Sequence, residues 1–207
     1  MEASLPLSWG CGAVRVSVTG LDTRISNRMV CYCRDCQAFA HFLGKPETLL
    51  DEFGGSDIVQ VSQGQVHIEQ GLEHIACVNL TDGNLLRWYT SCCNTPIGNA
   101  PAGTMPFVGL LKQCLDCDES QLDQAVGPVQ GYVFDKWAAS DEAPRGAPML
   151  RVMGRFLRII LVAKYRGDRR RSPFFDPDTG LPIHDPQHLS AQEREAVYSR
   201  VDNRKEN

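Results

Sequence analysis

Three cysteines within six residues, Cys31, Cys33 and Cys36, constrain this chain more than any other feature of its sequence. Alternate residues of a strand point to one face, so a strand Met29–Cys33 would present its two thiols together, with Cys36 close behind. Three soft ligands within reach of one ion are typical of tetrahedral zinc sites. The alternative is three unrelated core thiols, since free cysteine is often a small buried hydrophobe. The spacing predicts one zinc ion per chain.

Three thiolates leave one tetrahedral position of zinc open, which is the pattern of a catalytic site. Water, a fourth protein thiolate or an exogenous thiol could fill it, and zinc would keep such a thiol deprotonated. Cys11 and Cys93 lie in separate turns of the sequence and are the candidates for an additional protein ligand. The sequence does not choose among these ligands.

The length, composition and net charge are those of an ordinary globular protein. The chain has 207 residues, 43% hydrophobic residues and a formal charge of −4, so no nucleic-acid partner is indicated. Nine cysteines is an odd count, and the first residues lack a basic and then apolar leader. We therefore expect a reducing, cytoplasmic setting in which cysteines serve metal or redox chemistry. The oligomeric state is not predicted.

Most of the chain reads as short strands separated by glycine turns, which predicts a mainly β (α+β) fold with an antiparallel meander or sandwich. Short helices are expected at Cys36–Leu43 and Glu119–Val126, and residues 92–96 are expected to form a tight loop. The expected strands are Leu5–Trp9, Ala13–Thr19, Met29–Cys33, Ile58–Ser62, Val66–Glu69, Ile75–Leu80, Leu85–Tyr89, Phe107–Lys112 and Gly131–Trp137.

The C-terminal third predicts helices packed on this domain. Met149–Tyr165 is apolar with interposed arginines; it is too short and too charged to span a bilayer. We expect it to cover a sheet face with its arginines directed outward, rather than to lie on a membrane. Ser190 and Glu193 form a capping box that opens a last polar helix. The expected organisation is a zinc domain over 1–140, a linker and helix over 141–165, and a polar tail over 166–207.

Other candidate ligands fit less well. Cys114 and Cys117 form a second Cys-x-x-Cys pair without a matching partner pair, so we interpret them as packing residues of undetermined role. His41 lies about 140° around a helix from Cys36, a poor angle for sharing an ion. Asp35 is a candidate general base by position alone.

The motifs resemble the glutathione-dependent formaldehyde-activating enzyme family, which includes centromere protein V and has a zinc-bearing β-tent fold. The resemblance spans roughly residues 5–98. Its parts are Gly10-Cys11-Gly12-Ala13-Val14, then Cys31-Tyr-Cys33-Arg-Asp-Cys36, then Arg87-Trp88-Tyr89-Thr90-Ser91-Cys92-Cys93-Asn94-Thr95.

The resemblance implies a carbon–sulfur lyase-like enzyme that acts on the adduct of a glutathione-type thiol and a small aldehyde, with zinc at Cys31, Cys33 and Cys36. It also implies a second, structural zinc, but Trp9 and Thr90 stand where two of its four cysteines belong. We therefore expect that site to be absent, or rebuilt with Cys92. The alternative function is a non-catalytic zinc module whose C-terminal helix and tail bind a partner.

Overall fold

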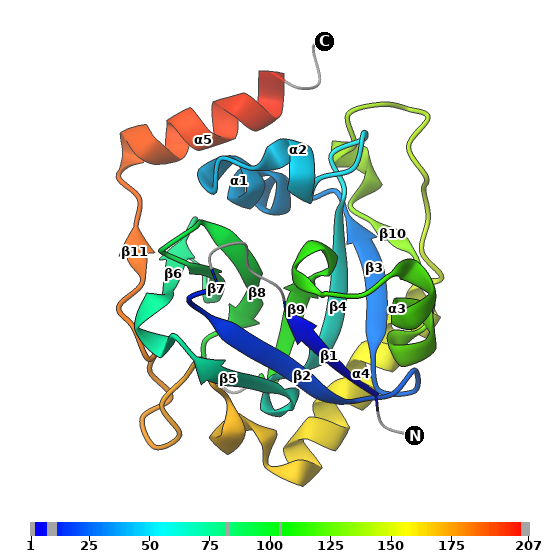
Figure 1. The fold of residues 1–207 in the computed structure, drawn as a ribbon. Helices are drawn as coiled ribbons and strands as arrows, with labels where there is room; N and C mark the ends of the chain where they lie inside the picture. The colour runs from blue at the N-terminus through cyan, green and yellow to red at the C-terminus, as the bar shows by residue number, and fades with distance from the viewer. Residues whose placement is uncertain (1–2, 8–11, 82, 104, 204–207) are drawn as a thin grey trace.

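A computed structural model describes residues 3–7, 12–81, 83–103 and 105–203. The chain forms strands and helices in the order shown in Figure 1. The strands are β1 (Ala3–Leu7), β2 (Arg15–Leu21), β3 (Asn27–Cys31), β4 (Ser56–Ser62), β5 (Val66–Gln70), β6 (Ile75–Asn79), β7 (Leu85–Thr90), β8 (Thr95–Pro101), β9 (Phe107–Leu111), β10 (Tyr132–Val133) and β11 (Gln187–His188). The helices are α1 (Arg34–Phe42), α2 (Pro46–Leu49), α3 (Glu119–Val126), α4 (Met149–Arg166) and α5 (Ala191–Asn203).

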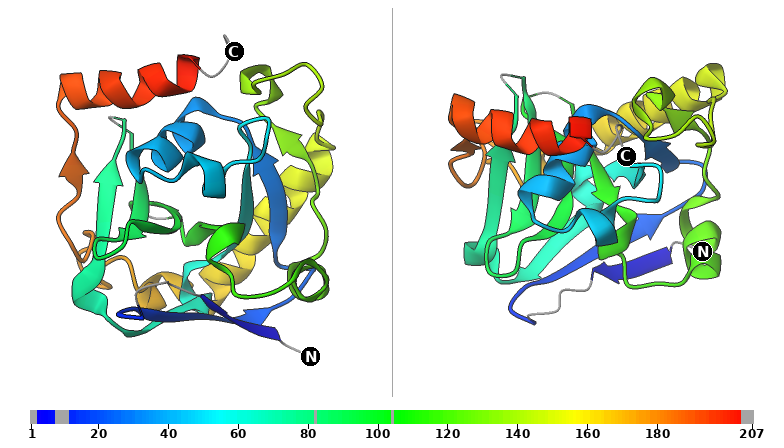
Figure 2. Two further views of the ribbon diagram at one scale, coloured as in Figure 1. Left: turned by 45° about the horizontal axis from the view of Figure 1, so that its top comes forward. Right: turned by 90° about the horizontal axis from the view of Figure 1, so that it is seen from above.

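The strands form two sheets, and the expected mainly antiparallel β fold is confirmed. The small sheet has the order β1-β2-β5, and the large sheet has the order β10-β3-β4-β9-β8-β7-β6-β11. Among the described residues, only the two-residue edge strands β10 and β11 pair in parallel, with β3 and β6. Seen from above, β1 and β2 lie on one side of the large sheet and α4 lies on the other (Figure 2).

The main core lies between the two sheets and α1. Val16 and Val18 of β2, and Val14 just before this strand, alternate with polar residues and are all buried, as their spacing predicts. Across the core, the buried Trp88 ring of β7 packs against Phe174 and Phe175, with centroid distances of 5.1 and 5.7 Å. This packing ties the segment that follows α4 to the large sheet.

The helix α4 packs on β3, β4 and β9, which confirms that it covers a sheet face. Its Val152, Ile159, Ile160 and Ala163 are buried, whereas a second apolar stripe that includes Leu150 and Leu161 is exposed. The expectation that its arginines all point outward is wrong for Arg155, which donates to the Thr23 and Ser26 carbonyl oxygens. Within the described residues, no helix has both the length and the apolarity needed to cross a membrane.

The last helix packs on the domain, as expected of the C-terminal helices, because α5 contacts α1. The capping box is present: the Glu193 carboxylate accepts from the Ser190 backbone N–H, and Ser190 Oγ accepts from the Glu193 N–H. Val197 and Val201 are the apolar residues that this helix buries. The tail therefore adds a cover over α1.

Two predicted elements differ from the structure. The segment 92–96 is not wholly loop, since β8 begins at Thr95; this strand contains Pro96 and Gly98, and pairing with β7 and β9 overrides their poor strand propensity. The strand expected over 131–137 shrinks to β10 because Phe134 takes a left-handed backbone, φ 58°, and a single helical turn follows. The strand β11 had not been predicted, and the end of the first predicted strand, Trp9, lies outside the described residues.

Candidate metal centre

The three cysteines meet where β3 passes into α1. Cys31 is the last residue of β3, so the prediction that Cys31 and Cys33 share a strand was wrong. Cys33 is instead the N-cap of α1, and its Sγ accepts from the backbone N–H of Cys36, 3.4 Å away. The helix needs a capping acceptor at this position, and a thiol fills the role that a hydroxyl usually takes. The first turn of α1 then brings Cys36 back toward Cys31.

The geometry of the thiols fits a tetrahedral zinc ion. The Sγ atom of Cys36 lies 3.2 Å from that of Cys33 and 3.7 Å from that of Cys31, and all three lie within 4.8 Å of one another. Zinc–sulfur bonds of about 2.3 Å place tetrahedral ligand sulfurs about 3.8 Å apart. Small shifts in two side chains would let all three bind one ion. Among the described residues, this is the one group with the composition and spacing of a metal site.

Arg87, for which no role was predicted, lies beside the cysteines. Its side chain is only 3% exposed, and Nη1 lies 3.8 Å from Cys36 Sγ and donates to Asn99 Oδ1 over 2.9 Å. Three thiolates around a divalent ion leave one net negative charge, and a buried charge needs a partner. Arg87 supplies that charge. The sequence feature that could have indicated this role is a single arginine within the mostly apolar strand β7.

The electrostatics of the three thiols are unequal. Hydrogen bonds with the Cys31 and Cys33 thiols, and the nearby Arg87 guanidinium, hold the pKa of Cys36 well below its ordinary value despite burial. The pKa of Cys31 is raised, because its hydrogen bonds with the other two thiols and its burial favour the protonated form. Of these two thiols, Cys36 therefore ionises more readily, and the thiolate is the form of cysteine that binds a metal ion.

The cysteines open into a cavity of about 370 Å³. Polar groups on its wall are Asp35, Gln60, Arg87 and Asn99, and the rest is mainly apolar. A closed structural site would have no such space beside its ligands. The arrangement leaves room for a ligand or substrate next to the sulfur atoms.

The helix α5 braces this region. Tyr198 donates from its hydroxyl to Asp35 over 2.7 Å, and the Arg34 guanidinium pairs with Asp202 at 2.6 Å. Burial and the Asp35 carboxylate raise the pKa of Tyr198. Asp35 is 43% exposed, and its Oδ2 lies 4.0 Å from Arg87. The candidate general base predicted from position therefore lies in the cavity wall, held by two other side chains.

The structure does not bring the remaining candidates into this group. The Cys93 sulfur contacts the hydroxyls of Thr90 and Thr95 at 3.1 and 3.2 Å, and Lys45, at the start of α2, donates to the Cys93 carbonyl oxygen. Cys114 is buried and hydrogen-bonded to the Leu111 carbonyl, and neither it nor Cys117 or His41 joins the metal group. Cys11 lies outside the described residues.

Comparison with known proteins identifies the family. A family model described as a family of unknown function, DUF6151, matches residues 1–184. The chain belongs to DUF6151. The match spans β1–β10, the three cysteines and α4, whereas β11 and α5 lie beyond it.

No curated protein matches the chain. Among solved structures, a Rhodobacter sphaeroides protein determined by the Northeast Structural Genomics project is similar, with 15% identity and a TM-score of 0.41. The match covers 62% of this chain and 97% of that one.

Proposed function

We propose that this protein is a zinc-dependent carbon–sulfur lyase-like enzyme that acts on the adduct of a thiol and a small aldehyde. The observation that carries the proposal is a cluster of three thiols that opens directly into a cavity, with a buried arginine to balance its charge. The order and spacing of the cysteine motifs, which resemble those of the glutathione-dependent formaldehyde-activating enzymes, also support it.

When bound at Cys31, Cys33 and Cys36, zinc would supply a positive charge that keeps a substrate sulfur in its thiolate form. The chain's own residues then have defined roles in breaking the adduct. The Asp35 carboxylate accepts the proton of the adduct hydroxyl, and the O–H electron pair becomes the second bond of the aldehyde carbonyl. The carbon–sulfur bond breaks, and its electron pair leaves with sulfur as a thiolate. The reverse sequence makes the adduct.

Arg87 serves this chemistry without touching the reacting bond. Its position against Cys36 and Asn99 holds a positive charge beside the sulfur cluster, where negative charge gathers as the thiolate leaves. The hydrogen bond from Tyr198 orients the Asp35 carboxylate.

A non-catalytic zinc module is the second candidate. The packing of α5 against α1 supports this candidate, because a helix that covers the cysteine region would also suit a structural zinc site. The two functions differ in whether an exogenous thiol can reach the metal.

Titration of cobalt-substituted protein with small thiols tests the proposal. Cobalt reports each new thiolate ligand through its charge-transfer bands. We expect these bands to grow and saturate on addition of a thiol, and an aldehyde added next to form its hemithioacetal faster than in free solution. Bands that no thiol changes would leave the structural module as the better account.

A further inference from the structure

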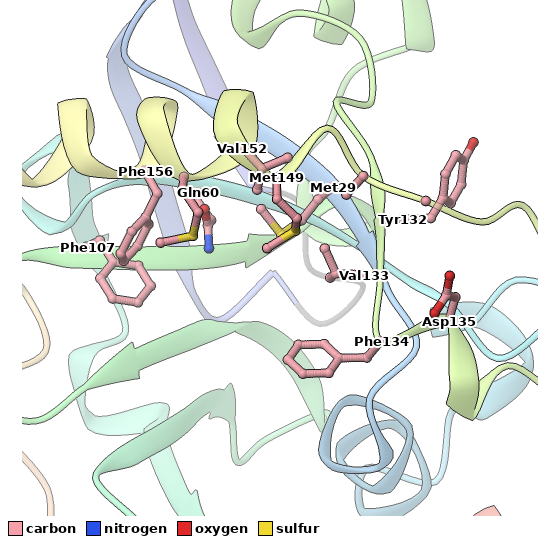
Figure 3. A pocket seen from close by; sticks show the side chains of 13 residues that line it. Met29, Gln60, Phe107, Tyr132, Val133, Phe134, Asp135, Met149, Val152 and Phe156 are labelled. Atoms are coloured by element: carbon pink, nitrogen blue, oxygen red, sulfur yellow. The ribbon is translucent and has the colours of Figure 1, made fainter.

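A second cavity, of about 450 Å³, lies between α4 and the large sheet (Figure 3). The first half of α4 forms one wall through Met149, Val152, Met153 and Phe156. The sheet forms the other wall, where the Phe107 ring meets the Phe156 ring edge to face at a centroid distance of 4.8 Å. The side chains around the space are mainly methionine, valine, alanine and phenylalanine. An apolar cavity of this size suits part of a small molecule.

This second cavity adjoins the cysteine cavity. Five residues line both: Met29, Gln60, Phe107, Val133 and Phe134. Cys31, Cys36 and Val152 of α4 also belong to one packed cluster, so the metal ligands and the α4 wall are in contact through the same apolar group. A molecule held by the cysteine centre could therefore extend directly under α4.

Phe134 marks the junction of the two cavities. Its ring is 58% exposed although it lines both spaces, and its backbone has φ 58°. A left-handed backbone at an aromatic residue is strained, and such strain gathers at ligand sites. Gln60 is the one polar side chain common to both walls; its Oε1 accepts from Asn27 Nδ2 over 2.9 Å, and Figure 3 shows its amide nitrogen turned toward the space.

The charges on the walls disfavour an anionic ligand. Across both cavities the charged lining residues are Asp35, Asp135 and Arg87. Arg87 already faces Cys36, Asn99 and Asp35, so it is committed to the sulfur centre. Glutathione carries two carboxylates and one ammonium group, so it is a net anion; its carboxylates would meet two protein carboxylates, with no further cation among the described lining residues to receive them. The same walls provide a large apolar surface that glutathione would leave unused.

We propose that the thiol used by this protein is apolar, with an alkyl or aryl chain that occupies the cavity under α4 while its sulfur completes the cysteine centre. This inference rests on the proposed function, because it requires an open metal position. It replaces the glutathione-type thiol, which the family resemblance implies, with a different substrate class.

A chain-length series on cobalt-substituted full-length protein tests the inference. The probes are 1-propanethiol, 1-butanethiol, 1-hexanethiol and glutathione, each titrated against the charge-transfer bands. Burial of each methylene should tighten the Kd about fourfold, or on the order of 60-fold from propanethiol to hexanethiol. Glutathione should bind more weakly than hexanethiol.

A substitution in the wall of the cavity under α4 tests whether the alkyl chain of the thiol lies there. Ala147 lines only the cavity under α4, so Ala147→Leu fills that space without changing the wall of the cysteine cavity. It should abolish most of the gain from propanethiol to hexanethiol and leave the propanethiol Kd and the cobalt stoichiometry unchanged. Leu150→Ala is the matched control: Leu150 lies nearby in the first turn of α4, is 94% exposed and lines neither cavity, so the full gain should remain.

The outcomes separate the two proposals. If no thiol alters the bands, the open metal position and the proposed function fail together. If thiols bind but the Kd does not depend on chain length, or glutathione binds as tightly as hexanethiol, the function stands and the apolar-thiol inference is overturned. A chain-length gain that survives Ala147→Leu in a protein that still binds cobalt would also overturn it, because the chain would then lie elsewhere.

Discussion

Replacement of Arg87 by methionine should weaken zinc binding strongly without unfolding the protein. Methionine keeps an unbranched apolar stem but removes the guanidinium that lies beside the cysteines. In the native protein the guanidinium lies 3.8 Å from Cys36 Sγ and is 3% exposed, so little water screens it. The net negative charge of three thiolates and a divalent ion would lose its partner.

The size of the effect follows from this separation. Two unit charges 3.8 Å apart interact by about 4 kcal/mol at an effective dielectric constant of about 20, which corresponds to roughly 1,000-fold in a binding constant. The negative charge is spread over three sulfurs, so we expect the zinc Kd to rise by at most about 1,000-fold and by at least roughly 30-fold.

The assay is a competition titration for zinc against a chelating dye at neutral pH, with unfolding measured in parallel. Arg28→Met is the matched control, because Arg28 is also 3% exposed but pairs with Asp57, Glu119 and Asp123, away from the metal group. That variant should lose stability and keep its zinc affinity. A zinc Kd for Arg87→Met within about threefold of the native value would refute the charge-balance argument.

Three further predictions follow from the same structure. Purified protein should hold one tightly bound zinc per chain, and Cys33→Ser or Cys36→Ser should release it, since two thiolates bind far more weakly; elemental analysis checks this, and two equivalents in native protein would contradict it. The helix α4 should stay on the sheet rather than enter lipid because five basic residues interrupt its apolar sequence; strong co-sedimentation with neutral vesicles in moderate salt would oppose this. Burial raises the pKa of Cys114 from 9.0 to about 12, so the free energy of unfolding should fall as pH rises above 9, where only the unfolded thiol ionises. Denaturant titrations at about pH 8 and about pH 10.5 should show a loss of up to about 1.4 kcal/mol per pH unit, and Cys114→Val should remove this contribution.

The parts of the fold that depend on local pattern could be predicted from the sequence. The alternation of Val14, Val16 and Val18 indicates a strand, and the capping box at Ser190 marks where α5 begins. The helix α3 has the predicted bounds, Glu119–Val126, because Asp118 and Gln121 cap its start and Gly127 ends it. In each case residues close in sequence determine the structure.

The errors occur where distant parts of the chain decide the conformation. β8 forms despite Pro96 and Gly98 because β7 and β9 pair with it on both sides. Gly98 is needed there, since a side-chain carbon would lie 2.5 Å from the Gly109 carbonyl oxygen. No local sequence pattern predicts these contacts, because they form only when the sheet assembles.

The candidate site, too, could be predicted only in part from the sequence. The cysteine spacing identified the three thiols, but not the strand-to-helix geometry in which Cys33 caps α1. Arg87 lies 51 residues from Cys36 in sequence, and Tyr198 lies 163 residues from Asp35. The second cavity requires α4 to lie on β3, β4 and β9 with Phe134 between the two spaces. Charge balance and substrate space are therefore properties of the assembled structure.

X-ray absorption at the zinc edge of loaded protein, measured before and after addition of a thiol, tests the central claim most directly. We predict three sulfur neighbours at about 2.3 Å and one oxygen or nitrogen neighbour before addition, and four sulfurs after it. Four sulfurs without added thiol, or fewer than three under either condition, would contradict an open three-cysteine centre.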